Sequence, residues 1–160
     1  IEAFALLIKK YPSKKLILKI AGDGESLKEV KELVIKHDLI KQISFLGMLP
    51  ELMLPQFLND LTIYVHASFG ETMSTAIMQA MACGKPIIAS DVPGINNMIK
   101  NNETGILIPV LNSLMLANAF SQLIEDNSLK EKLENASKLH AQKYFSNRIM
   151  FQKYSNLFQQ

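Results

Sequence analysis

The sequence contains few of the residues that build disulfide or metal scaffolds. Its 160 residues include one cysteine, Cys83, and no tryptophan. A single cysteine cannot form an internal disulfide, and no group of cysteines and histidines has the spacing of zinc ligands. A chain of this length can bury about 70% of its unfolded surface without such staples. We therefore expect one domain over residues 1–160, with no structural metal, in a reducing compartment.

The sequence also lacks a strong charge of either sign and any long apolar run. Its 17 Lys+Arg and 15 Asp+Glu give a net charge of +2, which is too small for the electrostatic footprint of a nucleic-acid binder. No run approaches the roughly 18 to 20 apolar residues that span a bilayer, and no signal peptide is evident. We expect a cytoplasmic protein. The chain begins within an element at Ile1, so we also expect it to be part of a longer protein.

Short apolar runs alternate with segments of helical periodicity. The runs at 16–21, 42–46, 61–66, 86–90 and 105–109 predict strands, with helical segments at 1–11, 25–39, 53–60 and 75–83 and a short segment at 94–100. Strands that are apolar on both faces suit a parallel sheet covered by helices on each side. Three further helices are predicted at 112–125, 128–145 and 147–158. The pattern is typical of a doubly wound α/β fold with C-terminal helices.

The last of these helices carries Tyr154, Leu157 and Phe158. Two interpretations of this apolar segment remain open. It either packs on another domain or closes the core of this one.

The loops that follow the strands are the candidate binding site, because ligands of an open parallel sheet bind beyond the carboxyl ends of its strands. The longest such loop, 67–74, leads into a helix that begins at Ser74 and Thr75. Free N–H groups there would meet an anion, and the helix dipole adds roughly 0.3–1 kcal/mol. Alternatively, Ser74 simply caps the helix.

An acid lies in the same loop. The carboxylate of Glu71 is suited to accept hydroxyl protons, as a sugar requires. Phosphate donors beside a hydroxyl acceptor indicate a sugar phosphate. His66, at the end of the preceding predicted strand, is a further candidate ligand contact.

Other nucleotide-binding motifs are incomplete or absent. The turn Gly22-Asp23-Gly24 has Leu27 where a dinucleotide fingerprint has its third glycine. The turn is equally explained by a need for positive φ. No phosphate-binding P-loop and no nucleophilic serine or cysteine motif occurs.

The segment ASFGETMSTAIMQAMACGKPIIAS at 67–90 resembles the donor-site motif of family 4 retaining glycosyltransferases, which have the GT-B fold. Shorter similarities follow in the same order along the chain, at 2–4, 21–24, 45–47, 94 and 104–109. The resemblance covers roughly residues 1 to 145. It implies a mostly parallel, Rossmann-like, C-terminal domain that holds a nucleotide diphosphate sugar. We expect no further cofactor and no metal, since no acidic pair stands where a divalent ion would bridge phosphates.

The resemblance also implies roles for individual residues. Glu71 matches the first glutamate of a Glu-x7-Glu motif, which contacts the transferred sugar and is the candidate catalytic residue. The amides of Ser74 and Thr75 match phosphate contacts, and Met73 lines the sugar pocket. Gln79 replaces the second glutamate, so ribose binding should weaken. The remaining donor contacts implied are Gly22, Gly47, Leu49 and Glu51, of which the last three lie in the region that meets the base.

Two departures from the family pattern bear on activity. No acid lies near Asn97, which is a tolerable variation. The basic residues that clamp the diphosphate in the family would precede residue 1, together with the first strand of the sheet and the N-terminal acceptor domain. We therefore expect the isolated chain to be inactive. The parent protein would transfer a sugar from a nucleotide diphosphate sugar to a hydroxyl, with retention, in polysaccharide or glycolipid biosynthesis.

Two other functions remain open. Gln79 would fit a non-catalytic nucleotide-binding or partner-binding module, and a GT-B nucleotide-sugar epimerase is a third alternative. A cluster of lysines suits either a peripheral contact with the inner face of the membrane or an ordinary solvated helix end. These lysines are Lys9, Lys10, Lys14, Lys15 and Lys19.

Overall fold

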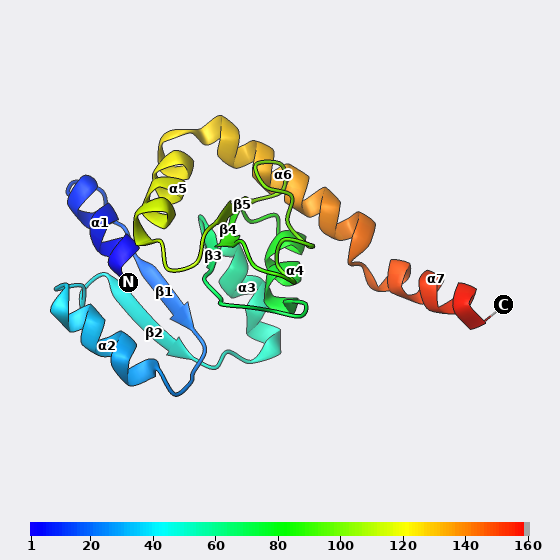
Figure 1. The fold of residues 1–160 in the computed structure, drawn as a ribbon, viewed down its shortest axis with the longest axis horizontal. Helices are drawn as coiled ribbons and strands as arrows, with labels where there is room; N and C mark the ends of the chain where they lie inside the picture. Colours follow the sequence, from blue (N-terminus) through cyan, green and yellow to red (C-terminus); the bar gives the residue numbers. More distant parts are fainter. Residues whose placement is uncertain (159–160) are drawn as a thin grey trace.

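The structure, a computed structural model, describes residues 1–158 as alternating helices and strands (Figure 1). The strands are β1 Leu18–Ala21, β2 Ile43–Gly47, β3 Tyr64–His66, β4 Ile87–Ser90 and β5 Ile106–Ile108. The α-helices are α1 Glu2–Lys10, α2 Leu27–Lys36, α3 Leu54–Asn59, α4 Thr75–Ala82, α5 Ser113–Glu125, α6 Asn127–Tyr144 and α7 Asn147–Phe158. A short 3₁₀ helix, η1 Glu51–Met53, precedes α3. The α/β class and the positions of the predicted strands are confirmed.

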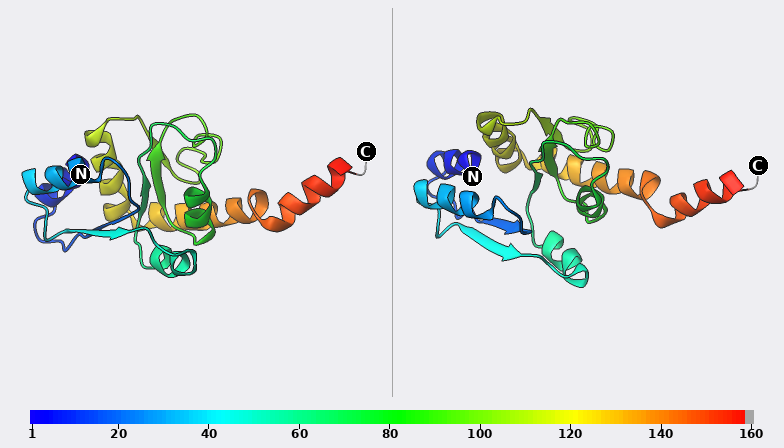
Figure 2. Two further views of the ribbon diagram at one scale, coloured as in Figure 1. Left: turned by 90° about the horizontal axis from the view of Figure 1, so that it is seen from below. Right: turned by 60° about the horizontal axis from the view of Figure 1, so that its bottom comes forward.

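The strands form two separate parallel sheets, as a Rossmann-like sheet without its central first strand would. β1 pairs with β2, and β3, β4 and β5 pair in that order. Within residues 1–158, β1 and β3 share no ladder, and the strands of the two sheets are inclined to one another (Figure 2). Within residues 1–158, β1 and β2 in one sheet and β3 and β5 in the other therefore each have one unpaired edge.

Helices cover both sheets and supply most of the core. α1 packs against α5, and α4 packs against α6. All four residues of β4 are buried, with Ile87 and Ile88 fully inaccessible, as predicted for a strand apolar on both faces. The buried face of α4 contributes Ile77 and Met81 to the same core. This packing fixes the start of α4 relative to the ends of β3 and β4.

The segment at 94–100 forms consecutive turns instead of a regular helix. The carbonyl of Val92 accepts hydrogen bonds from the N–H groups of both Ile95 and Asn96. Gly94, with φ +89, has a conformation that other residues rarely adopt. A residue with this φ cannot be part of a right-handed helix, so Gly94 lies outside any regular helix.

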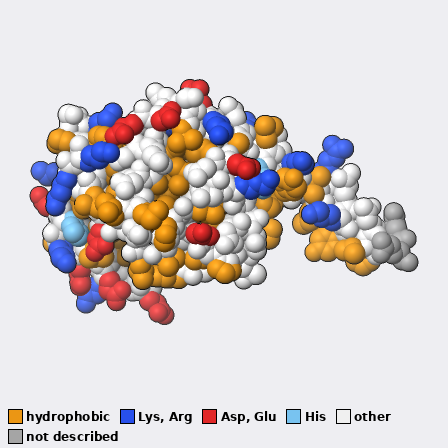
Figure 3. Space-filling view, turned by 45° about the horizontal axis from the view of Figure 1, so that its top comes forward, with side chains coloured by type: hydrophobic (Ala, Val, Ile, Leu, Met, Phe, Trp, Pro, Cys, Tyr) orange, Lys and Arg blue, Asp and Glu red, His pale blue; other side chains and the backbone are white. Residues whose placement is uncertain are grey.

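Helix α7 extends away from the rest of the molecule (Figure 1). None of its residues is buried, and Leu157 and Phe158 are 66% and 86% exposed. The interpretation that this helix closes the domain's own core is therefore wrong, because its apolar side chains lie on the surface (Figure 3). No helix within residues 1–158 is long and apolar enough to cross a membrane.

Candidate functional site

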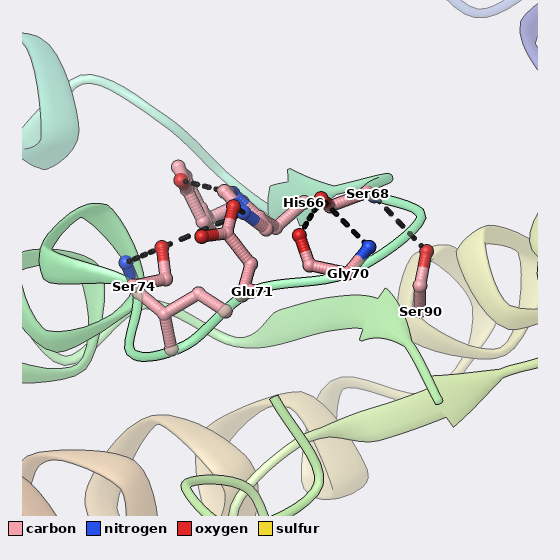
Figure 4. A network of polar contacts seen from close by, with 8 residues as sticks. His66, Ser68, Gly70, Glu71, Ser74 and Ser90 are labelled. Atoms are coloured by element: carbon pink, nitrogen blue, oxygen red, sulfur yellow. Dashed lines mark hydrogen bonds and ion pairs between the residues drawn. The ribbon is translucent and has the colours of Figure 1, made fainter. Parts of the chain in front are cut away.

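The loop after β3 is attached to β4 at its start. The N–H of Ser68 donates to the Oγ of Ser90, at 3.1 Å, and the hydroxyl of Ser68 donates to the carbonyl of Gly70, at 3.0 Å. Figure 4 shows these bonds to the right of Glu71, which lies between Gly70 and Ser74. The loop therefore has a defined path from β3 to α4.

Gly94 supports the same loop from the segment after β4. A Cβ atom at this position would lie 1.7 Å from the carbonyl oxygen of Glu71, so no other residue fits without a backbone shift. The close approach and the positive φ of Gly94 both require glycine here. The backbone of Glu71 is thus packed directly on the chain after β4.

The carboxylate of Glu71 lies against the side chain of His66. Its Oε1 is 3.0 Å from the Nε2 of His66, and the two side chains are 30% and 19% exposed. On the other side of the ring, the Nδ1 of His66 is 3.1 Å from the hydroxyl of Tyr64. Burial, and then the negative charge of Glu71, raise the pKa of Tyr64 to about 12. The hydroxyl of Tyr64 therefore keeps its proton at neutral pH.

The side chain of Ser74 has the capping role that the sequence predicts as one of two alternatives. Its Oγ accepts a hydrogen bond from the N–H of Ile77, at 3.4 Å, so the side chain caps the helix. Within residues 1–158, the N–H groups of Ser74, Thr75 and Ala76 have no acceptor. These three backbone donors follow Glu71 in the chain by three to five residues and lie at the positive end of the helix dipole.

Two other predicted donor contacts lie near this helix start. Met73 is 55% exposed, so its side chain lies at the surface rather than in a formed pocket. Gln79 is half-buried one helical turn after Thr75, on the same face of α4. Within the described residues, the side-chain amide of Gln79 makes no hydrogen bond.

The other predicted contacts form a second group at the ends of β1 and β2. The N–H of Gly22 donates to the carbonyl of Gly47, at 2.7 Å, and both glycines have positive φ. Leu49 is half-buried, and Glu51 is exposed at the start of η1. No hydrogen bond or ion pair within residues 1–158 joins this group to Glu71.

An open hollow of about 450 Å³ lies elsewhere, between the turn at 23–25 and the exposed face of α2. Its lining includes Lys28 and Lys31 but no residue of the loop 67–74. Among residues 1–158, no three His, Cys, Asp or Glu side chains are grouped so that they could hold a metal ion. The lysine cluster near α1 is exposed, and Lys10 pairs with Glu125 at 3.0 Å.

The sequence reasoning missed Tyr64 and Ser90. The alternation of a strand places residues i and i+2 on one face, so Tyr64 could have been predicted to lie beside His66. The bond between Ser68 and Ser90 joins residues 22 positions apart, and no local pattern indicates it.

The fold and the loop 67–74 together define the class of protein. A sequence model of the family described as "Glycosyl transferases group 1" matches residues 1–140, and the chain belongs to this family. Its fold is that of the C-terminal domain of a GT-B glycosyltransferase.

Individual relatives agree with this assignment. The chain is 30% identical to the alpha-D-kanosaminyltransferase of Streptomyces kanamyceticus over 126 residues, which are 78% of this chain and 33% of the relative. It is similar in structure to HepE of Anabaena in complex with UDP-glucose, with a TM-score of 0.87, 24% identity and coverage of 98% of this chain and 43% of HepE. It also resembles the C-terminal domain of the group 1 glycosyl transferase LpcC of Francisella tularensis, with a TM-score of 0.80, 26% identity and coverage of 91% and 77%. The chain thus spans about a third of the length of the first of these relatives.

Proposed function

We propose that this chain is the donor-binding half of a retaining glycosyltransferase of family 4. The longer protein would transfer a sugar from a nucleotide diphosphate sugar to a hydroxyl acceptor. Membership of the glycosyl transferase family supports the reaction class. One observation carries the assignment of the site: the free N–H groups at the start of α4 lie beside the carboxylate of Glu71.

In this proposal the diphosphate binds at the start of α4. The N–H groups of Ser74 and Thr75 would donate to its oxygens, and the helix dipole favours the negative charge. In the reaction, the bond between the anomeric carbon and the diphosphate oxygen breaks, and the diphosphate keeps the electron pair. The acceptor oxygen forms a bond to the same anomeric carbon and loses its proton, which the departing diphosphate takes up. Donors aimed at the leaving oxygen stabilise the charge that develops there.

The rest of the donor would contact two groups of residues: those of the loop 67–74 and α4, and those at the ends of β1 and β2. Glu71 would accept a hydrogen bond from a sugar hydroxyl, with Met73 beside the sugar. Gln79 would accept one bond from the ribose through its amide oxygen. The base would meet the segment 47–51, which includes Leu49 and Glu51 and begins at Gly47, next to Gly22.

Three parts of the enzyme would come from outside this chain. They are the acceptor domain, the basic residues that hold the diphosphate, and a strand between β1 and β3, each of which has an unpaired edge here. The 33% share of the kanosaminyltransferase that the chain spans supports this part of the proposal. We therefore expect the isolated chain to bind donor weakly and to form no product.

Amide chemical shifts of the ¹⁵N-labelled chain, measured during titration with UDP, test the proposed site. UDP is the first nucleotide to use, because HepE was solved with UDP-glucose. We expect the largest shifts at Ser74, Thr75 and Ala76. Inorganic phosphate at the same ionic strength is the control for general anion binding.

Two results would contradict the proposal. One is the absence of any change at the start of α4 when UDP saturates the chain. The other is a set of changes confined to the hollow between the turn at 23–25 and α2. Product formed by the isolated chain from UDP-glucose and an acceptor would contradict the expected inactivity only.

Gln79 favours a second function, a non-catalytic nucleotide-binding module. An amide in place of a carboxylate loses the charged acceptor for the ribose hydroxyls. Comparison of the longer protein with its Gln79→Glu variant separates the two functions. Turnover by the unchanged protein supports the enzyme, whereas a gain in UDP affinity by the variant, with no turnover in either form, supports the module.

A further inference from the structure

A polar chain of three side chains runs from β3 into the loop that carries Glu71. The hydroxyl of Tyr64 lies 3.1 Å from the Nδ1 of His66, and the Nε2 of His66 lies 3.0 Å from the Oε1 of Glu71. The rings of Tyr64 and His66 are stacked, with centroids 6.2 Å apart and an interplanar angle of 22°. Both nitrogens of the imidazole therefore have a partner, as Figure 4 shows for the side toward Glu71.

These partners determine which nitrogen carries the proton in the neutral ring. The hydroxyl of Tyr64 can donate to Nδ1, which leaves the proton on Nε2. The Nε2–H group then donates to the carboxylate of Glu71, which can only accept. In the opposite tautomer, a nitrogen lone pair would face a carboxylate oxygen, and that arrangement is repulsive. Hydrogen bonds on both sides thus favour the Nε2–H form.

Few other groups compete for the ring. The Oγ of Ser74 lies 3.5 Å from Nε2, but it already accepts the N–H of Ile77 as the helix cap. Within residues 1–158, Tyr64 on β3 and Glu71 in the loop are the only titratable side chains bonded to His66.

The arrangement leaves the two oxygens of Glu71 in different states. Oε1 is bonded to His66, whereas Oε2 has no hydrogen-bond partner within residues 1–158. The side chain is 30% exposed, so part of the carboxylate side chain is open to a ligand. A carboxylate held at one oxygen presents the other in a fixed direction, at a low cost in side-chain entropy on binding.

We propose that His66 is a positioning residue, held in the Nε2–H tautomer by Tyr64, that directs the free oxygen of Glu71 toward a hydroxyl of the bound sugar. This inference rests on the proposed donor site and adds the residue that orients its acid. His66 touches no ligand in this account and acts through Glu71 alone. Its contribution should therefore appear in the binding of the sugar and not in the binding of the nucleotide.

The ratio of the affinities for UDP-glucose and UDP is the quantity that tests this inference. His66→Leu removes the donor to Glu71, and we expect the ratio to fall about three- to tenfold, the size of one hydrogen bond of ordinary net strength, with little change in the affinity for UDP alone. His66→Gln, whose side-chain amide can donate near the position of Nε2, should restore part of the ratio. His140→Gln, in α6, is the control histidine variant and should leave the ratio unchanged.

The tautomer is measured directly in the unliganded chain by ¹H–¹⁵N correlation through the imidazole carbons, at a pH about 2 units above the usual histidine pKa of about 6.5. We expect the proton of His66 on Nε2. A proton on Nδ1 overturns the inference, and this readout does not depend on any ligand.

The outcomes also separate this inference from the proposed function. If the unchanged chain binds UDP-glucose no more tightly than UDP, and Glu71→Gln changes nothing, the sugar role of Glu71 fails, and the role of His66 fails with it. If Glu71→Gln lowers the ratio while a folded His66→Leu variant keeps it, the proposed function stands and the role of His66 is overturned. A lower ratio in His66→Leu that is partly restored in His66→Gln supports both the proposed function and the role of His66.

Discussion

Gly94 and Glu71 are in direct backbone contact, and this contact holds the candidate acid in place. A Cβ atom on Gly94 would lie 1.7 Å from the carbonyl oxygen of Glu71 and 2.5 Å from its carbonyl carbon. The contact joins the loop after β3 to the turns after β4. Those turns carry Ile95 and Ile99, which are fully buried in the core. The loop therefore rests on a rigid part of the fold.

We expect Gly94→Ala to displace this loop and destabilise the protein. The variant would combine a strained positive φ with a clash against backbone, so the free energy of unfolding should fall by about 2 kcal/mol or more. Urea denaturation measures the change. Gly70→Ala is the matched control in the same loop, because a Cβ atom there meets nothing within 4 Å. Equal stability of the two variants would contradict the contact.

We expect Ser74→Ala to lower the free energy of unfolding by about 1 kcal/mol, through loss of the acceptor for the N–H of Ile77. Thr75→Ala, at an exposed neighbouring position whose side chain makes no hydrogen bond within residues 1–158, should change it little. The affinity for UDP should survive Ser74→Ala, because the proposed phosphate donors are backbone groups. A complete loss of UDP binding in a folded Ser74→Ala variant would show that the side chain, rather than the amides, holds the phosphate.

Helix caps, buried strands and loop order could be predicted from the sequence because each depends on local pattern. Ser74 is such a residue: its side chain and its position before an apolar helix indicate the cap. The split of the sheet could not be predicted from local pattern, since apolar runs identify strands but not which strands share hydrogen bonds; the family resemblance implied it, by placing the central first strand before residue 1. The partner of Glu71 was also missed, because its bond to His66 depends on how the loop folds back.

The pKa of Tyr64 predicts a loss of stability at high pH. Because its folded-state value is raised from 10.0 to about 12, the folded protein keeps this proton at a pH where the unfolded chain has lost it. The stabilisation is fully present below about pH 10 and is lost as the pH rises through about 12. Between these two pH values, the free energy of unfolding should therefore fall more steeply with pH in the unchanged protein than in Tyr64→Phe. If the free energy of unfolding falls equally with pH in the two proteins, the raised pKa of Tyr64 is contradicted.

Lys85 ties α4 and β4 to the end of α3. Its Nζ donates to the carbonyl of Asn59, at 2.9 Å, and to that of Leu61, at 3.1 Å. We expect Lys85→Met to lower the free energy of unfolding by about 1 to 2 kcal/mol, because these carbonyls at a helix end lose a charged donor. Lys138→Met, on the exposed side of α6, should have a smaller effect in the same thermal or urea measurement.

A crystal structure of the chain, or of the longer protein that carries it, with UDP-glucose bound is the most direct test of the donor site. We predict diphosphate oxygens within about 3 Å of the N–H nitrogens of Ser74 and Thr75, at ordinary hydrogen-bond distance, and a glucose hydroxyl on the free oxygen of Glu71. A diphosphate bound elsewhere, with Glu71 turned away from the sugar, would contradict the account.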